Sequence, residues 1–349
     1  MTHPACQHRL ASVLAALFVW SFCVAPSSRA QELLPPSREV VYSHAFPGNW
    51  VMPKWHNGFL VEWKFDTKYS DEKTENVVVH DKDGKLFGKA RIWVDGATFL
   101  RITDADVSAD GKVVVVGNTI SGSGELSSYL AVISLPATTA HIVQTSPFDG
   151  RAVTFAPDGT VWVLGLQGGP KFNVAKAPDH HVIEQFGTDY VLKGQYLLRS
   201  EFPCEIHPAL TGNLGFPQIL ASADRIGFFA PNCRTWTELS PEGKLLGTWK
   251  WSAGALTSKG YDSTPIRVIT FTSTNELYAR RDFYSPTDVP YAARLVRFDR
   301  NSSTWIPVGT TAAGDAGLPF LTLMNADGDS LVYLAPGKTL VWAKAQTAP

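Results

Sequence analysis

The sequence predicts an all-β chain that folds as one six-bladed β-propeller, a closed ring of four-stranded antiparallel sheets. Beyond the N-terminal segment, no stretch of 12 residues keeps a 3.6-residue apolar period, so amphipathic helices are not expected. With 11 Trp, 10 Tyr and 19 Phe against 3 Met, the composition favours a rigid β-type core. A pair of β-rich runs around a tight turn recurs about every 50 residues, the period expected of propeller blades.

The recurring unit is a hairpin built on small turn residues. Asp-Gly and Asn-Gly suit tight hairpins because Gly and Asn adopt positive φ at low cost. The turns are centred near residues 57, 110, 158, 224, 275 and 327, in the segments 52–63, 106–117, 154–165, 219–230, 269–279 and 323–335. Each hairpin supplies the first two strands of one blade, counted outward from the axis.

Two further strands follow each hairpin, with turns such as Asp83-Gly84 and Glu242-Gly243. The sixth unit has only KTLVWAKA (338–345) before the sequence given ends. The segment REVVYSHAF (38–46) is available to supply its missing outer strand. We therefore expect the N-terminal strand to close the last blade, which protects the sheet edges that a linear array would expose.

The N-terminal segment has the features of an export signal. Residues 10–25 form an uncharged, mostly apolar run after Arg9, and Ser28 and Ala30 fit a cleavage site before Gln31. The alternative is a membrane anchor, but 16 residues fall short of the roughly 20 that span a bilayer. We expect a signal peptide over 1–30, a single domain over 31–349 with no transmembrane segment, and a secreted or periplasmic protein.

The balance of charges excludes some partners and reactions. Lys and Arg total 31 and Asp and Glu total 32, and no basic block occurs, so nucleic-acid binding is not expected. The chain carries no P-loop and no dinucleotide fingerprint. It also has no G-x-S-x-G nucleophile elbow between a strand and a helix. Catalytic residues therefore stay unassigned.

Cleavage of the signal would leave two cysteines, Cys204 and Cys233. Two thiols in an oxidising compartment usually pair, so we expect a disulfide, with two buried free thiols as the alternative. In the chain-entropy model, closing this loop of about 30 residues stabilises the fold by roughly 3–4 kcal/mol.

The lengths of the predicted connections differ between the two faces of the ring. The first-to-second and third-to-fourth turns are short, whereas the second-to-third loops and the links between blades are long. Long connections concentrated on one side usually signal recognition, although such loops can also plug the channel or shield blade edges. The long segments are 66–75, 118–128, 166–179, 203–216, 252–264 and 281–293.

The first strand of each blade lines the axis and carries polar side chains. Packed strands rarely carry charges unless these are paired or hydrated. One hypothesis is a polar funnel for an anionic or polyhydroxylated ligand; the other is mutual pairing of Asp104 or Asp106 with Arg151 in a water-filled channel. The residues concerned are Lys54, Asp104, Asp106, Arg151, Gln218 and Arg267.

An aromatic and cationic group near the long loop of the fifth blade, 281–293, adds Arg281 and Tyr284 to the candidate ligand-binding residues. Rings beside guanidinium groups suit stacking on a sugar or an aromatic ligand. Packing of the loop against its own blade explains the same residues. The other members of the group are Arg280, Phe283 and Tyr291.

The stretch APDGTVWVLG at 156–165 carries a strand–Asp-Gly–strand pattern, with Pro157-Asp158-Gly159 followed by Trp162. In this it resembles the broad group of six-bladed propellers that includes NHL-type and SMP-30/gluconolactonase-like proteins. The resemblance implies the propeller architecture for most of the chain. No specific subfamily is assigned, and none of the metal-binding acids of lactonase-type propellers is carried over to this sequence.

We therefore expect an exported propeller that binds a polar small molecule, a glycan or a protein partner on its long-loop face, with no identifiable catalysis. The alternative is a metal-assisted hydrolase or lyase of lactonase type at the mouth of the channel, with Asp104 or Asp106 holding a divalent metal. A purely structural role on the cell surface is a third hypothesis. No cofactor is identified from the sequence.

The export hypothesis predicts the form of the secreted protein. We expect its first residue to be Gln31 and expect no thiol to react until a reductant is added. Intact-mass measurement of the exported protein, with and without reduction and alkylation, checks both points. A mass that retains residues 1–30 would contradict the cleaved signal, and two thiols that react without reductant would contradict the disulfide.

Overall fold

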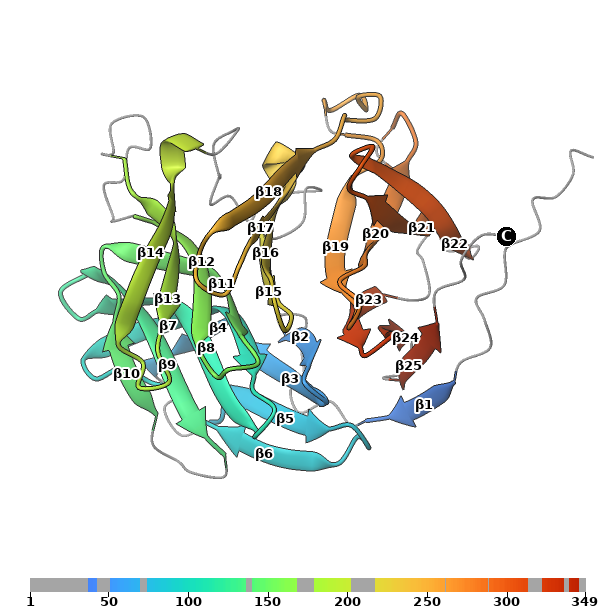
Figure 1. Ribbon diagram of the computed structural model, residues 1–349. Coiled ribbons are helices and arrows are strands. Elements are labelled where there is room, and N and C mark those ends of the chain that lie inside the picture. Colours follow the sequence, from blue (N-terminus) through green and yellow to red (C-terminus); the bar gives the residue numbers. More distant parts are fainter. Residues whose placement is uncertain are drawn as a thin grey trace, which may run out of the picture.

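The computed structural model is a ring of six β-sheets around a central axis (Figure 1). It describes residues 37–42, 51–69, 74–135, 140–167, 179–201, 217–260, 262–287, 289–312, 322–335 and 339–344. Within these residues the regular structure is β-strands and two short 3₁₀ turns, η3 (Arg199–Glu201) and η4 (Pro231–Cys233), with no α-helix. The all-β, six-bladed prediction is confirmed.

Each sheet is an antiparallel blade, and the blades are numbered here along the chain. Blade 1 comprises β2 (Val51–His56), β3 (Phe59–Lys64), β5 (Val77–Asp81) and β6 (Leu86–Ala90). Blade 2 comprises β7 (Ala97–Val107), β8 (Lys112–Ser121), β9 (Leu126–Ser134) and β10 (His141–Gln144), with β4 (Asp66–Lys68) as a fifth strand. Blade 3 comprises β11 (Phe148–Phe155), β12 (Val161–Gln167), β13 (His181–Phe186) and β14 (Leu192–Leu198).

The remaining blades follow the same order. Blade 4 comprises β15 (Gln218–Ala221), β16 (Ile226–Ala230), β17 (Thr235–Leu239) and β18 (Leu245–Lys250). Blade 5 comprises β19 (Ile266–Phe271), β20 (Leu277–Tyr284), β21 (Pro290–Asp299) and β22 (Thr304–Ala312). Blade 6 comprises β23 (Thr322–Asp327), β24 (Ser330–Ala335), β25 (Thr339–Lys344) and β1 (Arg38–Val41).

The first strand of every blade lies next to the axis. Each of these strands contacts the first strands of both neighbouring blades, so the contacts run unbroken around the ring. The hairpin turns that follow them have the predicted chemistry. In blade 1, Asn57 and Gly58 have φ of 51° and 84°, so both central residues of the turn are left-handed, as a tight hairpin requires. The spacing of the hairpin turns in the sequence thus predicted both the number and the order of the blades.

The last blade is closed by the N-terminal strand, as predicted. Strand β1 pairs with β25 along its whole length, with Arg38 opposite Trp342 and Val40 opposite Leu340. The Ser37 backbone N–H also donates to the Trp342 carbonyl oxygen over 2.8 Å. In Figure 1, β1 lies beside β25 and completes this sheet. The two ends of the chain thus share one blade.

The hydrophobic core lies between the blades rather than in one central cluster. Each cluster of buried side chains joins the facing surfaces of neighbouring sheets, and aromatic rings cross several of these boundaries. Trp55 of blade 1 meets Trp342 of blade 6 edge-on at a centroid distance of 5.1 Å. Trp236 of blade 4 meets Phe271 of blade 5 in the same way, also at 5.1 Å. Edge-to-face packing of this kind adds to the burial that holds the ring together.

Three of the predicted long loops differ in the structure. Strands β8 and β9 extend into 118–128 and leave only 122–125 as a turn. Strands β20 and β21 likewise extend into 281–293 and leave 285–289. Part of 66–75 forms β4, which pairs with the start of β7. These loop predictions were wrong because each segment continues a cross-strand ladder, in which the backbone satisfies its own hydrogen bonds.

Other predictions fall partly or wholly outside the described residues. These include the signal segment 1–30, most of the loops 166–179 and 203–216, and Cys204. Cys233 is 2% exposed and ends η4. Because Cys204 is not among the described residues, the disulfide between the two stays a prediction. The loop 252–264 is described except for residue 261, and Asp262 organises it by accepting the Gly254 N–H at 2.9 Å and the Thr264 N–H at 2.8 Å. No helix in the described part of the chain has the length and apolar character needed to span a membrane.

Closure of the ring predicts the effect of removing β1. Deleting residues 31–41 removes a strand of four residues. At about 0.5–1.5 kcal/mol per ladder position, we expect the free energy of unfolding to fall by about 2–6 kcal/mol. The exposed edge of β25 should also promote association between molecules. Denaturant unfolding and size-exclusion chromatography measure both effects.

The matched control deletes only residues 31–36, which precede Ser37 and leave β1 intact. That variant should unfold like the full mature chain. Equal stability of the two truncated forms would contradict the role of β1 in closing the ring.

Candidate functional site

A cavity of about 260 Å³ opens in the channel, at the end where the first strands begin. This is the end that carries the second-to-third loops and the links between blades. Four of the predicted site residues line the cavity together: Lys54, Asp104, Arg151 and Gln218. They come from the first strands of blades 1, 2, 3 and 4, so the ring brings together residues far apart in sequence. Half of the eight candidate ligand residues thus line one cavity, and their role in binding stays a prediction.

Irregular positions in the first strands contribute to the shape of this end of the channel. The strand register shifts around Thr103, Arg151, Arg267 and Met324, which belong to blades 2, 3, 5 and 6. A bulge leaves one residue out of the ladder and redirects its side chain. Thr103, Arg151 and Met324 line the cavity. The bulges thus place side chains in the channel that a regular strand would direct elsewhere.

Lys54 joins three blades at the wall of the cavity. Its Nζ donates to Asp104 Oδ2 over 3.1 Å and to the Val153 carbonyl oxygen over 2.7 Å. Asp104 Oδ2 also accepts the Val153 backbone N–H at 2.8 Å. The side chains of Lys54 and Asp104 are 15% and 16% exposed, so this ion pair is largely shielded from water. The lysine and the aspartate together satisfy both backbone groups of Val153 on the free edge of β11.

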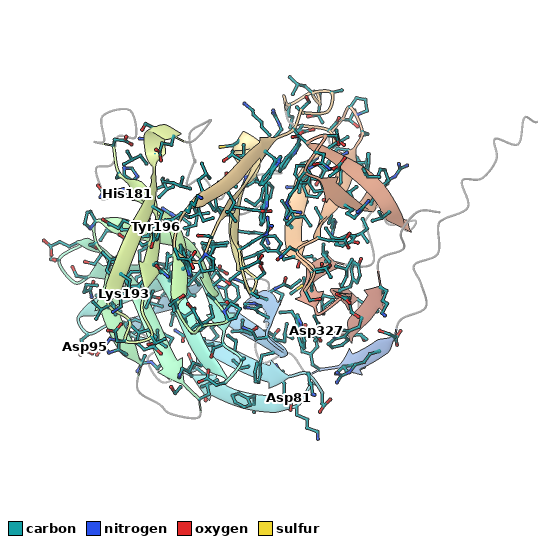
Figure 2. The ribbon with its side chains drawn as sticks, viewed as in Figure 1. Asp81, Asp95, His181, Lys193, Tyr196 and Asp327 are labelled. Carbon is teal, nitrogen blue, oxygen red and sulfur yellow. The ribbon has the colours of Figure 1, made fainter. Side chains whose placement is uncertain are left out.

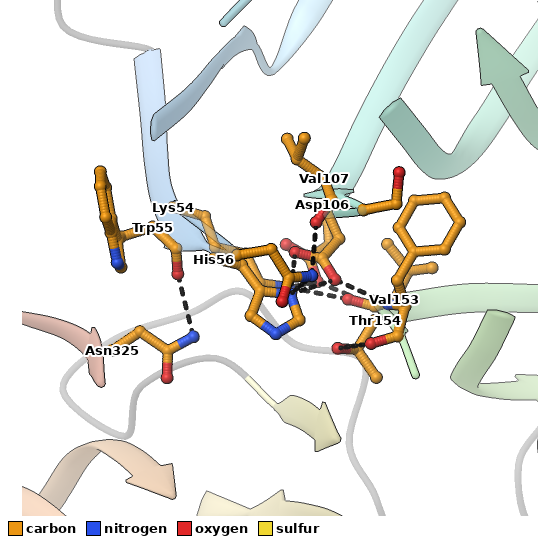
Figure 3. A network of polar contacts seen from close by, with 12 residues as sticks. Lys54, Trp55, His56, Asp106, Val107, Val153, Thr154 and Asn325 are labelled. Carbon is orange, nitrogen blue, oxygen red and sulfur yellow. Dashed lines mark hydrogen bonds and ion pairs between the residues drawn. The ribbon is translucent and has the colours of Figure 1, made fainter. Parts of the chain in front are cut away.

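A second pair lies further along the same strands, toward the hairpin turns. His56 Nδ1 lies 2.8 Å from Asp106 Oδ2, which also accepts the Phe155 N–H at 2.7 Å. The Asp106 side chain is fully buried, and His56 is 14% exposed. Figure 3 shows this pair beside Lys54, Val153 and Thr154. Asp106 thus lies outside the cavity lining and anchors blade 2 to blades 1 and 3.

The two carboxyl groups differ in their electrostatics. Burial acts to raise the pKa of Asp106, but the charges of His56 and Lys54 and the hydrogen bonds from His56 and Phe155 outweigh it, so this pKa lies below its ordinary value. Burial raises the pKa of Asp104 above its ordinary value, even though Lys54 and Val153 oppose the shift. As the pH falls, Asp104 is therefore the first of the two to take up a proton.

The opposite side of the channel has neutral links of the same kind. Gln218 Oε1 of blade 4 accepts the Ile269 N–H of blade 5 at 2.9 Å. Thr270 of blade 5 donates its hydroxyl to Asn325 Oδ1 of blade 6. Asn325 Nδ2 in turn donates to the Trp55 carbonyl oxygen of blade 1 over 2.9 Å, a contact drawn in Figure 3. Side chains on one blade thus replace the strand partner that the next blade lacks.

Arg151 has a different partner from the one expected. Pairing with Asp104 or Asp106 was the alternative to a ligand funnel, but Arg151 forms its ion pair with Asp149 of its own strand. The predicted pairing of Arg151 with Asp104 or Asp106 was wrong, because Asp104 pairs with Lys54 and Asp106 pairs with His56. Asp149 and Arg151 lie two residues apart, so their side chains can share a face of the strand despite the bulge between Gly150 and Ala152.

Besides Asp106, three of the predicted ligand residues lie outside the cavity lining: Arg267, Arg281 and Tyr284. Arg267 donates to Asp282 Oδ2 over 3.2 Å and to the Tyr284 hydroxyl, so Arg267 and Tyr284 pack together in blade 5. Arg281 lies in the same strand as Tyr284 but at an odd offset from it, and burial lowers its pKa against the opposing charge of Asp262. For these residues the packing interpretation fits better than a shared ligand funnel. Arg280 reaches Thr322 at the edge of the cavity over 3.4 Å.

The cavity combines an apolar wall with hydrogen-bond donors that lack acceptors. Buried atoms without a described partner include Thr103 Oγ1 and Arg151 Nε, whose residues both line it. A buried donor that stays unpaired costs free energy, so a ligand oxygen or an ordered water is expected there. The apolar lining comprises Pro53, Trp63, Pro217, Ile219, Leu220, Val268, Leu323, Met324 and Leu334.

The residues around the cavity do not fit a divalent metal. Asp104 is the one carboxylate among the described residues that line it, and its Oδ2 lies 3.1 Å from a lysine ammonium. Calcium takes six to eight oxygen ligands, and catalytic zinc takes three protein ligands. Across the described ranges, no three His, Cys, Asp or Glu side chains come together in a metal-binding arrangement. We therefore derive no metal-dependent step.

Several residues of the site were missed in the sequence. His56 is a lone histidine next to a turn, and Thr103, Asp149 and Asn325 carry no motif. The positions of Asp149 and Arg151, separated by one residue on a first strand, were the available signal for an ion pair on one face. The contacts of Asn325 with other blades had no such signal, because they join residues about 270 positions apart.

Comparison with known proteins bears on the fold. No protein-family model matches the chain, and no curated protein matches it. Among solved structures, a member of the DUF4221 family from Bacteroides vulgatus is 10% identical, with a TM-score of 0.53 and coverage of 91% of this chain and 98% of that one. A candidate exported protein from Bacteroides fragilis is 9% identical, with a TM-score of 0.50 and coverage of 91% and 99%.

The periplasmic gluconolactonase of Pseudomonas aeruginosa is 12% identical, with a TM-score of 0.44 and coverage of 87% of this chain and 86% of that one. Identities this low show the architecture and leave the reaction unassigned. The chain is a six-bladed β-propeller without a specific subfamily, as the sequence pattern predicted.

The buried contacts of Asp106 predict a large effect of Asp106→Asn. Asparagine keeps one acceptor oxygen, but its amide N–H donors replace the second carboxylate oxygen, which accepts a hydrogen bond in the wild type. We expect the free energy of unfolding at neutral pH to fall by about 1.5–3 kcal/mol, the value of one hydrogen bond to a charged group. Denaturant unfolding of the two proteins measures the difference.

The pH dependence of that difference follows from the lowered pKa. A carboxyl group whose pKa is lower in the folded state stabilises fully above its unfolded pKa of about 3.9, and this contribution is lost as the pH falls through the folded pKa. The two proteins should therefore converge in acid. The control is Asp110→Asn on the following hairpin, where the side chain is 61% exposed and the effect should stay below about 1 kcal/mol. A pH-independent difference for Asp106→Asn would contradict the electrostatic origin.

Proposed function

We propose that the protein binds a compact, oxygen-rich organic molecule in the channel cavity, with no catalytic step of its own assigned. The observation that carries the proposal is a pair of buried donors without a described acceptor, Thr103 Oγ1 and Arg151 Nε, on two residues that line this cavity. Lys54 adds an ammonium group with three N–H donors, and two of its contacts are accounted for. The site is therefore richer in donors than in acceptors.

The charge and size of the cavity narrow the ligand class. Its described lining holds two cations, Lys54 and Arg151, and one carboxylate, Asp104; the ion-pair partner of Arg151, Asp149, lies outside the lining. A volume of 260 Å³ lies just below the about 300–1,000 Å³ of most small-molecule pockets. The apolar wall formed by residues such as Leu323 and Met324 suits a carbon skeleton. A small hydroxy acid or sugar acid matches all three properties.

The metal-assisted hydrolase or lyase of lactonase type has less support. It needs several oxygen or nitrogen ligands at one point, and the described lining supplies one carboxylate, which already accepts a hydrogen bond from Lys54. The binding hypothesis needs only the donors that the cavity has.

We also propose that the protein works outside the cytoplasm, after cleavage of the segment 1–30. The uncharged run at 10–25 supports this proposal. A ligand would then reach the channel from the side of the long connections, where the first strands begin.

Ligand titration of the wild type and of Arg151→Leu tests the channel proposal. We expect one or more members of a panel of hydroxy acids, sugar acids and matching neutral polyols to bind the wild type. The substitution should raise the dissociation constant at least about tenfold, as loss of a charge-assisted hydrogen bond predicts. Isothermal titration calorimetry gives both constants.

The matched control is Arg297→Leu, because Arg297 forms a half-exposed ion pair with Glu276 away from the cavity. Its dissociation constant should equal that of the wild type. Equal weakening by both substitutions would count against the cavity as the site. Stabilisation of the wild type by Ca²⁺ or Zn²⁺ of about 2.7 kcal/mol, expected near a hundredfold excess over the dissociation constant, would favour the metal-dependent alternative instead.

A further inference from the structure

A second cavity, larger than the channel cavity, lies between blades 2 and 3. Its volume is about 640 Å³, within the range of about 300–1,000 Å³ usual for small-molecule pockets. It is bounded by the outermost strand of blade 2, β10, and by β13 and β14 of blade 3. Figure 2 labels Lys193 on β14, one of the strands that bound the groove. None of the sequence predictions concerned this groove.

A buried carboxyl group with spare acceptor capacity lies in the groove. Glu184 is 6% exposed, and Gln195 Nε2 donates to its Oε1 over 2.8 Å. A carboxylate offers about four acceptor positions on two oxygens, so one amide donor leaves most of them available. Burial raises the pKa of Glu184, with the hydrogen bond from Gln195 opposing this shift. Donors supplied by a ligand would offset the cost of keeping this group charged.

Aromatic rings form another part of the groove. The rings of His141 and Tyr190 lie 5.7 Å apart at 35°, and Tyr190 packs against the cluster of buried side chains that contains Phe148 and Phe186. Tyr190 has a φ of 62°, in the left-handed region that a tyrosine adopts rarely. The turn thus holds this ring at the groove despite an unfavourable backbone conformation.

We propose that this groove binds a neutral carbohydrate. Sugar hydroxyl groups both donate and accept, and the side-chain amides of Gln144, Gln167 and Gln195, which line the groove, do the same. Two neighbouring hydroxyl groups can donate to Glu184, and the apolar face of a pyranose ring packs on Tyr190. The proposal is independent of the ligand proposed for the channel.

The charge of the groove separates this ligand class from others. Its described lining contains no lysine or arginine, so an acidic ligand would meet Glu184 without a compensating cation. The second carboxyl group, Asp189, already faces Lys193 Nζ at 3.4 Å. A cationic ligand would have Glu184 alone as its counter-charge, and the amides would gain nothing from it. A neutral ligand with many hydroxyl groups uses more of the lining than either.

Titration with neutral hexoses, N-acetylhexosamines and their disaccharides tests the proposal, with glucuronate and glucosamine as charged counterparts. Glu184→Gln should weaken binding of the neutral sugars at least about tenfold, the change produced by 1.4 kcal/mol. Tyr190→Asn should do the same, because asparagine tolerates the left-handed conformation and removes the ring. Calorimetry measures affinity, and circular dichroism and thermal melting check folding.

Matched controls are Glu276→Gln and Tyr69→Asn, whose side chains lie on other parts of the surface; Tyr69 is 55% exposed. Both should bind as the wild type does. His141→Ala, at an exposed position, serves as a further groove variant should Tyr190→Asn fail to fold. The proposal is overturned if no neutral sugar binds, if glucosamine or glucuronate binds more tightly than the neutral sugars, or if the groove variants bind as tightly as the controls.

Discussion

The inner edge of each blade imposes the constraint on which the rest of this structure depends. Apart from the start of β7, which also pairs with β4, a first strand has a neighbour on one side only, and its other edge faces the channel with N–H and C=O groups that no strand pairs. Here side chains from the preceding blade take the place of the missing strand. Asp104 accepts the N–H of Val153, and Gln218 accepts that of Ile269. Both acceptors lie three residues before the last ladder pair of their hairpins, so one solution recurs in two blades.

This constraint explains why charge in the channel is a poor guide to function. Asp106 is fully buried and charged, yet its oxygens are occupied by His56 and Phe155. Such a residue stabilises the ring and is unavailable to a ligand. The proposed channel site rests instead on groups without a described partner, such as Arg151 Nε. The proposed groove site rests on an acceptor instead, the Glu184 carboxyl group, whose described donor is Gln195 Nε2.

The sequence was sufficient for the architecture because its signals are local. Turn residues such as Asn57 and Gly58 and alternation within each strand predicted the hairpins, and counting them predicted the closing role of β1. Four of eight candidate ligand residues converge on one cavity for the same reason, since the start of every first strand meets at the axis. Position in the repeat was thus informative about the site as well as the fold.

What the sequence left open depends on contacts between blades and on strand irregularities. The partner of Arg151 could not be inferred because a bulge at its own position sets the direction of its side chain. Segments 118–128 and 281–293 were wrongly predicted as loops because their polar residues extend the pairing of β8 with β9 and of β20 with β21. The groove escaped notice because Glu184 and His141 belong to different blades, and nothing in the local pattern relates them.

The shared sixth blade has a kinetic consequence. The contact between Ser37 and Trp342 spans 305 positions, so this sheet joins segments that are far apart in the sequence. Pairing across such a separation carries a large loop-closure entropy and is slow compared with hairpin formation. The other five blades use segments much closer together in sequence and can therefore assemble first, while strand β1 would wait, unpaired, for β25. Annealing of that single strand is then the step that turns a stack of sheets into a ring.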